Sequence, residues 1–249
     1  MKWIKKGSKT VLNEFIGSVK AKIITDPTKY DGGKALWLRR DVDYDLDHAI
    51  KFAEYEYRNN IRATYFLLHT APYFDYSKEF KEKILLLDDM GHSIGFHNDI
   101  LSCWHKNQEM GLNDFIPKPI KFLRKAAPPV NGTSCHGAKE HYDRKYFNYE
   151  CWEEFDKKKN EGFDAICGFK PSLERYGFEY EAYFLPYTHY FSDSGNNWIG
   201  YVVNGQKPFE RTALESPDNL GTKVIDKFNE AEEGLFQMLL HPCHWEEVL

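Results

Sequence analysis

Short apolar runs alternate with amphipathic stretches along the first hundred residues. Residues 35–40 (ALWLRR) and 61–68 (IRATYFLL) are rich in apolar, aromatic and β-branched side chains, which predicts two buried strands. Residues 46–60 between them have apolar positions at helical spacing, with Asp45 or Asp47 as the predicted N-cap. The predicted inward face of this helix consists of Leu46, Ala49, Ile50, Ala53 and Tyr57.

A second helix and a third strand follow. Residues 77–91 predict a helix that Ser77 caps and Gly91 ends, because glycine accepts the left-handed conformation of a helix C-terminus. Its predicted buried side chains are Phe80, Ile84 and Leu87. Residues 92–99 then predict a short strand with a polar end. Strands that alternate with helices at this spacing indicate βαβ units and a parallel sheet.

The second half of the chain continues the alternation less regularly. The pattern predicts helices at 120–127, 151–162 and 223–234. It predicts strands at 163–169, at 181–194 around a turn at Pro186, and at 235–245, where the strand runs into a loop. Neither a repeat nor a low-complexity linker divides the 249 residues. We therefore predict one α/β domain over residues 1–249, with its sheet closed as a barrel.

Composition and charge narrow the class of protein. Hydrophobic residues make up 42% of the chain and charged residues 29%, which is typical of a globular protein. The net charge of −5 disfavours nucleic acid as a partner, and no apolar run reaches the ~18 residues of a membrane span. The amino-terminal lysines precede no apolar segment, and the five cysteines form no C-x-x-C pair. We expect a reduced, cytoplasmic protein with no secretory signal.

Carboxylates and imidazoles recur at the ends of the predicted strands. In parallel α/β folds, ligands bind beyond the carboxyl ends of the strands. Two neighbouring carboxylates, Asp41 and Asp43, repel each other unless a cation or a shared proton offsets their charge. The other strand-end residues are His97, Asn98, Asp99, His136, Asp193, Trp198, His241, Trp245 and His244, the last of which we interpret as a loop residue. Because acids and imidazoles recur at the same end of several strands, this set favours a functional site there.

Several of these segments resemble one known family. The segments LRRDVDYD, ATYFLL and GHSIGFHND, together with FSDSGNNW and LLHPCHW, are similar to motifs of the polysaccharide deacetylase (NodB-homology) superfamily, or carbohydrate esterase family four. The resemblance spans roughly residues 36 to 245 in separate blocks. It implies an irregular (β/α)7 barrel and metal-dependent removal of acetyl groups from sugars. The metal in this family is commonly zinc, bound by one aspartate and two histidines.

The resemblance also implies roles for individual residues. Asp41 matches the general base, and Asp43 and His97 match metal ligands. His241 matches the histidine that protonates the leaving group, and Asp193 the acidic residue that orients it. A bound cation would lower the pKa of water from ~15.7 toward ~7, and a carboxylate could then take its proton. An imidazole with a pKa near neutral suits protonation of the departing nitrogen.

The chain departs from the family at the third ligand. The family has a second histidine four residues after the first, where this chain has Leu101. We predict His136 as the replacement, with His105 and Asp99 as alternatives. His92, at the start of a strand, is interpreted as structural. The family's third motif is also absent, with SCHGAKEHYD in its place.

Other polar and aromatic residues near the strand ends are candidates for substrate contacts. Either Arg39 or Arg40 could hold the Asp41 carboxylate as an anion. We predict that Arg40, Asp99, Trp198 and Trp245 contact the carbohydrate, although packing in the core or at its rim explains the tryptophans equally well.

Three functions remain open from the sequence. The first is a metal-dependent hydrolase that deacetylates a sugar during synthesis or modification of a bacterial surface polysaccharide. The second is hydrolysis of a cyclic amide or ureide, as in allantoinase-like relatives of the superfamily. The third is a non-catalytic, sugar-binding member of a glycan assembly system.

Overall fold

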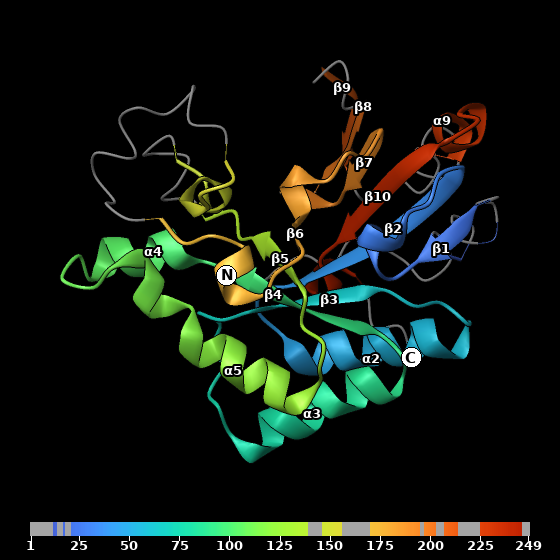
Figure 1. The fold of residues 1–249 in the computed structure, drawn as a ribbon. Helices are drawn as coiled ribbons and strands as arrows, with labels where there is room; N and C mark the ends of the chain where they lie inside the picture. Colours follow the sequence, from blue (N-terminus) through green and yellow to red (C-terminus); the bar gives the residue numbers. More distant parts are fainter. Residues whose placement is uncertain are drawn as a thin grey trace. The chain divides into compact units, whose positions relative to one another are not determined.

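The structure is a computed structural model of the chain. It describes residues 21–138, 146–155, 170–194, 197–202, 207–213 and 225–245, together with Leu12, Asn13 and Gly17. The chain divides into two compact units, drawn in Figure 1. The first comprises residues 1–65, 89–93 and 186–249, and the second comprises residues 66–88 and 94–185.

The sheet of the first unit has the strand order β1–β2–β10–β7–β8–β9. Its strands are β1 (Lys22–Ile24), β2 (Lys34–Val42), β10 (Gly234–Leu240), β7 (His189–Ser192), β8 (Asn197–Val202) and β9 (Lys207–Ala213). The pairs β1–β2, β2–β10 and β10–β7 are parallel, whereas β7–β8 and β8–β9 are antiparallel. The carboxyl ends of β2, β10 and β7 therefore lie at one edge of this sheet.

Helix α2 (Leu46–Arg58) begins where the sequence predicts. The side chain of Asp45 accepts a 2.9 Å hydrogen bond from the backbone N–H of His48, which makes Asp45 the N-cap. Tyr57 was predicted to face inward, and this is wrong, because its side chain is 47% exposed and lies against the Arg62 guanidinium. The described part of this unit also contains the helices η1 (Pro27–Lys29), α9 (Ile225–Glu230) and η10 (Pro242–His244).

In its described residues, the second unit combines three parallel strands with three α-helices. Strands β4 (Ser93–Asn98), β5 (Gly132–Cys135) and β6 (Tyr180–Glu181) pair in that order, and β3 (Thr64–Leu68) runs from the first unit into the second. The helices are α3 (Lys78–Asp89), α4 (Ile100–Lys106), α5 (Pro117–Ala126), η2 (Leu112–Phe115), η3 (Asn148–Cys151), η5 (Glu174–Tyr176) and η6 (Ala182–Phe184).

Aromatic packing joins α3 to α5, which run side by side in Figure 1. The rings of Phe80 on α3 and Phe122 on α5 stack with their centroids 5.4 Å apart. The Ser77 hydroxyl accepts a 3.0 Å hydrogen bond from the backbone N–H of Phe80, which confirms the predicted cap. Ile84 and Leu87 are fully buried, as predicted.

The order of parallel strands and helices fits the predicted α/β class, an irregular (β/α)7 barrel. The helix predicted at 151–162 is absent from its described part, where Cys151 ends η3 and residues 152–155 form bends and turns. The strand predicted at 163–169 lies outside the described residues. None of the helices in the described parts of the chain is long and apolar enough to cross a membrane.

Candidate active site

Three adjacent parallel strands of the first unit end in polar residues. Leu240 at the end of β10 pairs with Arg40 on β2, and Leu239 pairs with Ser192 on β7. The residues that directly follow these positions are Asp41, His241 and Asp193. Because neighbouring parallel strands bring their carboxyl ends to one edge, sequence-distant acids and imidazoles gather there.

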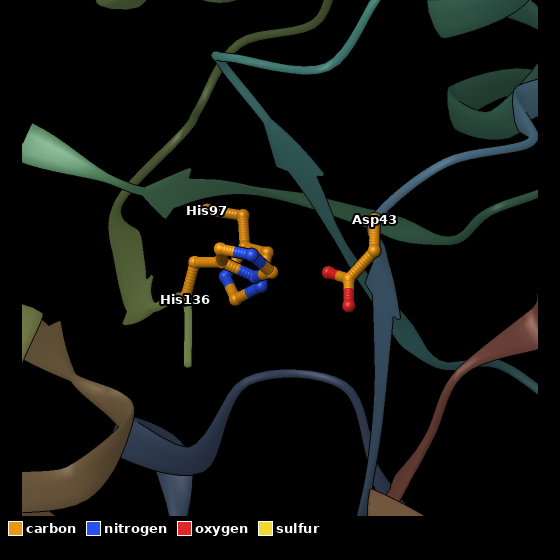
Figure 2. A group of neighbouring side chains, drawn as sticks. All are labelled: Asp43, His97 and His136. Atoms are coloured by element: carbon orange, nitrogen blue, oxygen red, sulfur yellow. The ribbon is translucent and has the colours of Figure 1, made fainter. Parts of the chain in front are cut away.

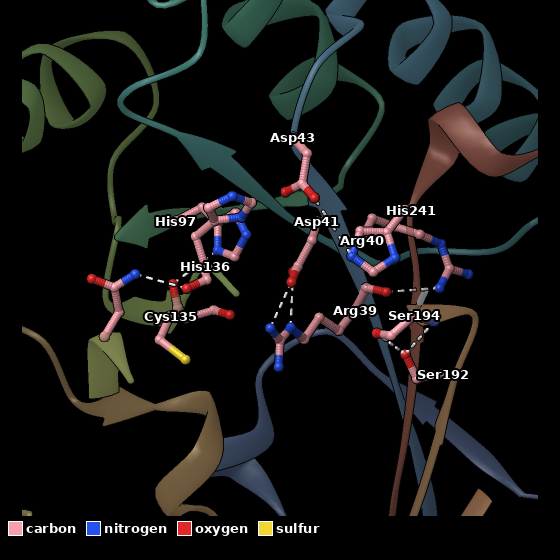
Figure 3. Close-up of polar contacts among 12 residues, drawn as sticks. Arg39, Arg40, Asp41, Asp43, His97, Cys135, His136, Ser192, Ser194 and His241 are labelled. Carbon is pink, nitrogen blue, oxygen red and sulfur yellow. Dashed lines mark hydrogen bonds and ion pairs between the residues drawn. The ribbon is translucent and has the colours of Figure 1, made fainter. Parts of the chain in front are cut away.

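Asp41 is held by an arginine of its own strand. Alternate residues of a strand share a face, so Arg39 and Asp41 point the same way. The Arg39 guanidinium donates two hydrogen bonds to the Asp41 carboxylate, at 2.8 Å and 2.6 Å, and both side chains are buried (Figure 3). This bidentate pair fixes the carboxylate in both position and orientation.

Arg40 points to the opposite face and has a different partner. Its side chain is fully buried and donates to the Glu56 carboxylate at 2.6 Å and 3.0 Å. The Tyr65 hydroxyl donates to the same carboxylate at 2.6 Å. The predicted contact between Arg40 and substrate is therefore wrong: Arg40 belongs to a buried network that joins β2, α2 and β3.

Asp193 and His241 form a buried pair. The His241 ring Nδ1 donates to the Asp193 carboxylate at 2.6 Å, and the His241 backbone N–H donates to it as well, at 2.9 Å. The Nε2 of His241 lies 3.7 Å from the Asp43 carboxylate (Figure 3). Burial opposes protonation of His241, but the neighbouring carboxylates, chiefly that of Asp193, raise its pKa to about 9. Burial likewise opposes ionisation of Asp193, and the imidazoles outweigh it and hold its pKa well below the usual range.

Trp245 and His244 complete the surroundings of Asp193. The Trp245 indole N–H donates to the Asp193 carboxylate at 3.1 Å, and the His244 Nδ1 lies 3.5 Å from it. Only 1% of Trp245 is exposed, so the predicted stacking of Trp245 on a sugar is wrong, and its N–H positions Asp193 instead. His244, which we interpreted as a loop residue, is likewise buried and lies beside the Asp193 carboxylate.

Asp193, His241 and His244 have ligand atoms within 4.8 Å of one another, close enough to hold a metal ion. The hydrogen bonds argue against that use. A backbone N–H and an indole N–H can only donate, and both already occupy Asp193 oxygens. The Asp193 carboxylate is therefore arranged to accept hydrogen bonds rather than to coordinate a cation.

The second unit contributes two histidines from neighbouring strands. His97 lies on β4 and His136 directly follows β5, where Asn98 pairs with Cys135. Their rings make an edge-to-face contact with centroids 5.2 Å apart. The Nδ1 of His97 is 2.9 Å from the Ser134 backbone oxygen and must donate to it, so the lone pair of the neutral ring is on Nε2, the atom that would coordinate a metal. Figure 2 draws both histidines with Asp43, which directly follows β2; the three are of the residue types that hold metal ions.

Asp99, an alternative ligand and predicted substrate contact, is engaged within its own unit. Its carboxylate accepts hydrogen bonds from the Thr70 hydroxyl at 3.1 Å and from the Asn148 amide at 3.0 Å. The Asn148 amide also donates to the backbone oxygen of His136 at 2.7 Å. These bonds indicate that Asp99 positions the loop that carries His136. His105, the other alternative, packs its ring against Trp104.

Sequence reasoning missed His69, which directly follows β3. Its ring Nε2 accepts a 2.9 Å hydrogen bond from the backbone N–H of Asp99, and the ring packs against Phe96. Burial, together with the nearby imidazoles of His97 and His136, lowers the pKa of His69 to about 4. Its place at the carboxyl end of a strand was the available signal. The side chain of Trp198, a predicted substrate contact, lies outside the described residues.

Comparisons with known proteins place these features beside known structures. A scan against protein-family models found no match, and a search of curated proteins found none either. The chain is similar to the structure of a family 4 carbohydrate esterase from Bacillus anthracis, with 20% sequence identity and a TM-score of 0.32 over 50% of this chain and 57% of that chain. It is similar to a mutant of a CE4 family pseudoenzyme with restored enzymatic activity, with 14% identity and a TM-score of 0.44 over 90% of this chain and 61% of that one.

A third similar structure is the polysaccharide deacetylase Bc1974 from Bacillus cereus, with 13% identity and a TM-score of 0.45. That match covers 86% of this chain and 82% of the other. The chain spans about three fifths of the length of the first two structures. The first two structures are described as members of carbohydrate esterase family 4, and the third as a polysaccharide deacetylase.

Proposed function

We propose that the protein is a metal-dependent carbohydrate deacetylase. One observation of the first unit carries this proposal: an arginine-clamped carboxylate, Asp41, and a carboxylate-bound imidazole, His241, lie at the carboxyl ends of the adjacent parallel strands β2 and β10. Hydrolysis of an amide needs a base for the attacking water and an acid for the departing nitrogen. Asp41 and His241 are chemically suited to these two roles.

Asp41 acts as the general base. A carboxylate has about four lone-pair positions, and the two Arg39 hydrogen bonds occupy two of them. The clamp limits rotation of the carboxylate, and orienting the base in advance lowers the entropic cost of the proton transfer.

His241 acts as the general acid. Asp193 binds the Nδ1 proton, so the transferable proton is carried on Nε2, the atom nearer to Asp43. In the metal-free protein the neighbouring carboxylates, chiefly that of Asp193, outweigh burial and raise the pKa of His241 to about 9, which favours the protonated imidazole at neutral pH.

Asp43, His97 and His136 are the proposed ligands of a divalent metal, which we propose to be zinc. One carboxylate and two imidazoles form a common catalytic zinc set, and the Ser134 carbonyl fixes the tautomer in which Nε2 of His97 carries the lone pair. When bound, the metal would polarise the acetyl carbonyl and acidify water. We further propose that the substrate is an acetylated sugar of bacterial surface polysaccharide, because of the motifs in the sequence. We also propose that the protein acts in the cytoplasm, because its five cysteines are odd in number and form no C-x-x-C pair.

Acetate release from an N-acetylglucosamine tetramer by zinc-loaded protein tests the proposal. Asp41→Asn should lower the rate by about 10²- to 10⁴-fold, because it removes the base while keeping the shape of the side chain. Asp45→Asn is the matched control, since asparagine caps a helix as well as aspartate does. A fully active Asp41→Asn variant would exclude Asp41 as the base. Ring opening of hydantoin without acetate release would favour the cyclic amide hydrolase, and sugar binding without either reaction would favour a binding protein.

A further inference from the structure

The hydrogen bond to His69 determines which of its ring nitrogens carries the proton. The backbone N–H of Asp99 can only donate, so the Nε2 of His69 must accept with its lone pair at 2.9 Å. A neutral imidazole with an acceptor at Nε2 has its proton on Nδ1. His69 is therefore fixed as an Nδ1–H donor.

The position of this donor is also fixed. The His69 ring packs against Phe96 with centroids 5.0 Å apart, and the His69 backbone N–H donates to the His97 backbone oxygen at 3.3 Å. His97 and His136, two of the proposed metal ligands, belong to the same unit. His69 thus follows β3 at the same strand ends as these ligands.

The Nδ1–H of His69 has no hydrogen-bond partner among the described residues, and the side chain is partly exposed. His92 provides a direct contrast. It is buried, its Nδ1 accepts from the Ala63 backbone N–H at 3.2 Å, and its Nε2 is 3.1 Å from the Ala53 backbone oxygen. In the described part of the chain, both ring nitrogens of His92 make hydrogen bonds to the backbone, whereas only Nε2 of His69 does.

We propose that the Nδ1–H of His69 donates a hydrogen bond to an oxygen atom of the carbohydrate substrate, which makes His69 a substrate-binding residue. This inference rests on the proposed function, because the oxygen belongs to the acetylated sugar. The candidates are a sugar hydroxyl and the acetyl carbonyl. Loss of a bond to a hydroxyl raises KM, whereas loss of a bond that strengthens as charge develops on the carbonyl lowers kcat.

Two substitutions separate the two nitrogens of His69. His69→Gln places an amide oxygen near the position of Nε2, so it can still accept from Asp99 but lacks the donor at Nδ1. His69→Asn places an amide N–H near the position of Nδ1 but lacks the acceptor for Asp99. With the N-acetylglucosamine tetramer as substrate, His69→Gln should lose about 3- to 10-fold in kcat/KM, the usual effect of one neutral hydrogen bond. His69→Asn should stay within about twofold of the wild type in kcat/KM and should unfold at a lower temperature.

A purely structural His69 predicts the reverse order, with His69→Gln fully active and His69→Asn impaired, and that result would overturn the inference. His92→Gln is the matched control: it should lower stability and leave kcat/KM unchanged.

A second readout does not depend on turnover. In the ¹⁵N spectrum of metal-free protein, His69 should be the Nδ1–H tautomer, and the tetramer should shift its Nδ1 resonance. A shift without acetate release would support the inference while contradicting the proposed function. Acetate release with wild-type kinetics in His69→Gln would support the proposed function while contradicting the inference. An Nε2–H tautomer, or a resonance that the tetramer leaves unchanged, would also overturn the inference.

Discussion

Substitution of Asp193 by asparagine tests how the general acid is kept protonated. Asp193 is fully buried and accepts the Nδ1 proton of His241 at 2.6 Å. Burial alone would lower the pKa of His241, and the Asp193 carboxylate is the main group that opposes it. Asp193→Asn removes this charge, so we expect the pKa of His241 to fall from about 9 to below its ordinary value of 6.5.

The size of the effect follows from the difference between these values. A change from about 9 to 6.5 corresponds to about 3 kcal/mol of stabilisation of the protonated imidazole. Because the pKa in the folded protein lies above the unfolded value, this stabilisation is complete below pH 6.5 and is lost as the pH rises through about 9. The free energy of unfolding of the wild type should therefore fall across this interval, and that of Asp193→Asn should change much less.

Histidine NMR titration of metal-free protein measures the pKa directly, and urea unfolding between pH 6 and 10 measures the stability. Metal-free protein is used because a cation at the adjacent Asp43 would also lower the pKa. Asp45→Asn removes a charge from the same unit and should leave the His241 titration near that of the wild type. If the pKa of His241 in Asp193→Asn stays near 9, the proposed role of Asp193 is refuted.

Four further substitutions, one of them a matched control, test the buried clamp and the packing of the second unit by urea unfolding. Arg39→Met leaves the buried Asp41 carboxylate without its ion-pair partner and should cost about 3–5 kcal/mol, so a loss below about 1 kcal/mol would contradict the clamp. Ile84→Ala should lower the free energy of unfolding by about 2–5 kcal/mol, because Ile84 is fully buried. The neighbouring Leu85→Ala, at a 37% exposed position, should change it by about 0.5 kcal/mol or less. Equal losses of stability in the two variants would refute the assignment of Ile84 to the buried face of α3. Gly95→Ala would place a methyl carbon 2.3 Å from the Phe66 ring and should cost about 1–3 kcal/mol, and a neutral effect would show that the two strands do not approach this closely.

Local signals predicted the parts of the fold that depend on local chemistry. Asp45 and Ser77 cap the helices that the sequence assigns to them, because a side-chain oxygen before a helical apolar pattern has one clear use. Phe80, Ile84 and Leu87 are buried because α3 keeps a regular period. Tyr57 fits the same kind of period but lies at the last turn of α2, where Arg62 covers its ring and water remains accessible.

The sequence indicated which residues are candidates for the site better than it indicated their hydrogen-bond partners. The sequence singled out Asp41, Asp193 and His241 because they lie near the ends of predicted strands and match motifs of the family that it resembles. The choice between Arg39 and Arg40 was left open, although the two-residue period of a strand already favours Arg39 as the partner of Asp41.

Other contacts depend on tertiary structure. No local pattern reveals that Trp245 is buried and donates its indole N–H to Asp193. Nor does one reveal that Arg40, on β2, binds Glu56 on α2. The β8–β9 hairpin was missed although Asn204-Gly205, a frequent turn pair, lies in the sequence between its strands.

The metal content of the purified protein tests the central claim most directly. Protein saturated with zinc and then dialysed should retain one zinc per chain by elemental analysis. Asp43→Ala and His97→Ala should each retain essentially none, whereas Asp41→Asn should retain one. Undiminished zinc in both ligand variants, or no zinc in the wild type at saturating concentration, would contradict a catalytic metal bound by these residues.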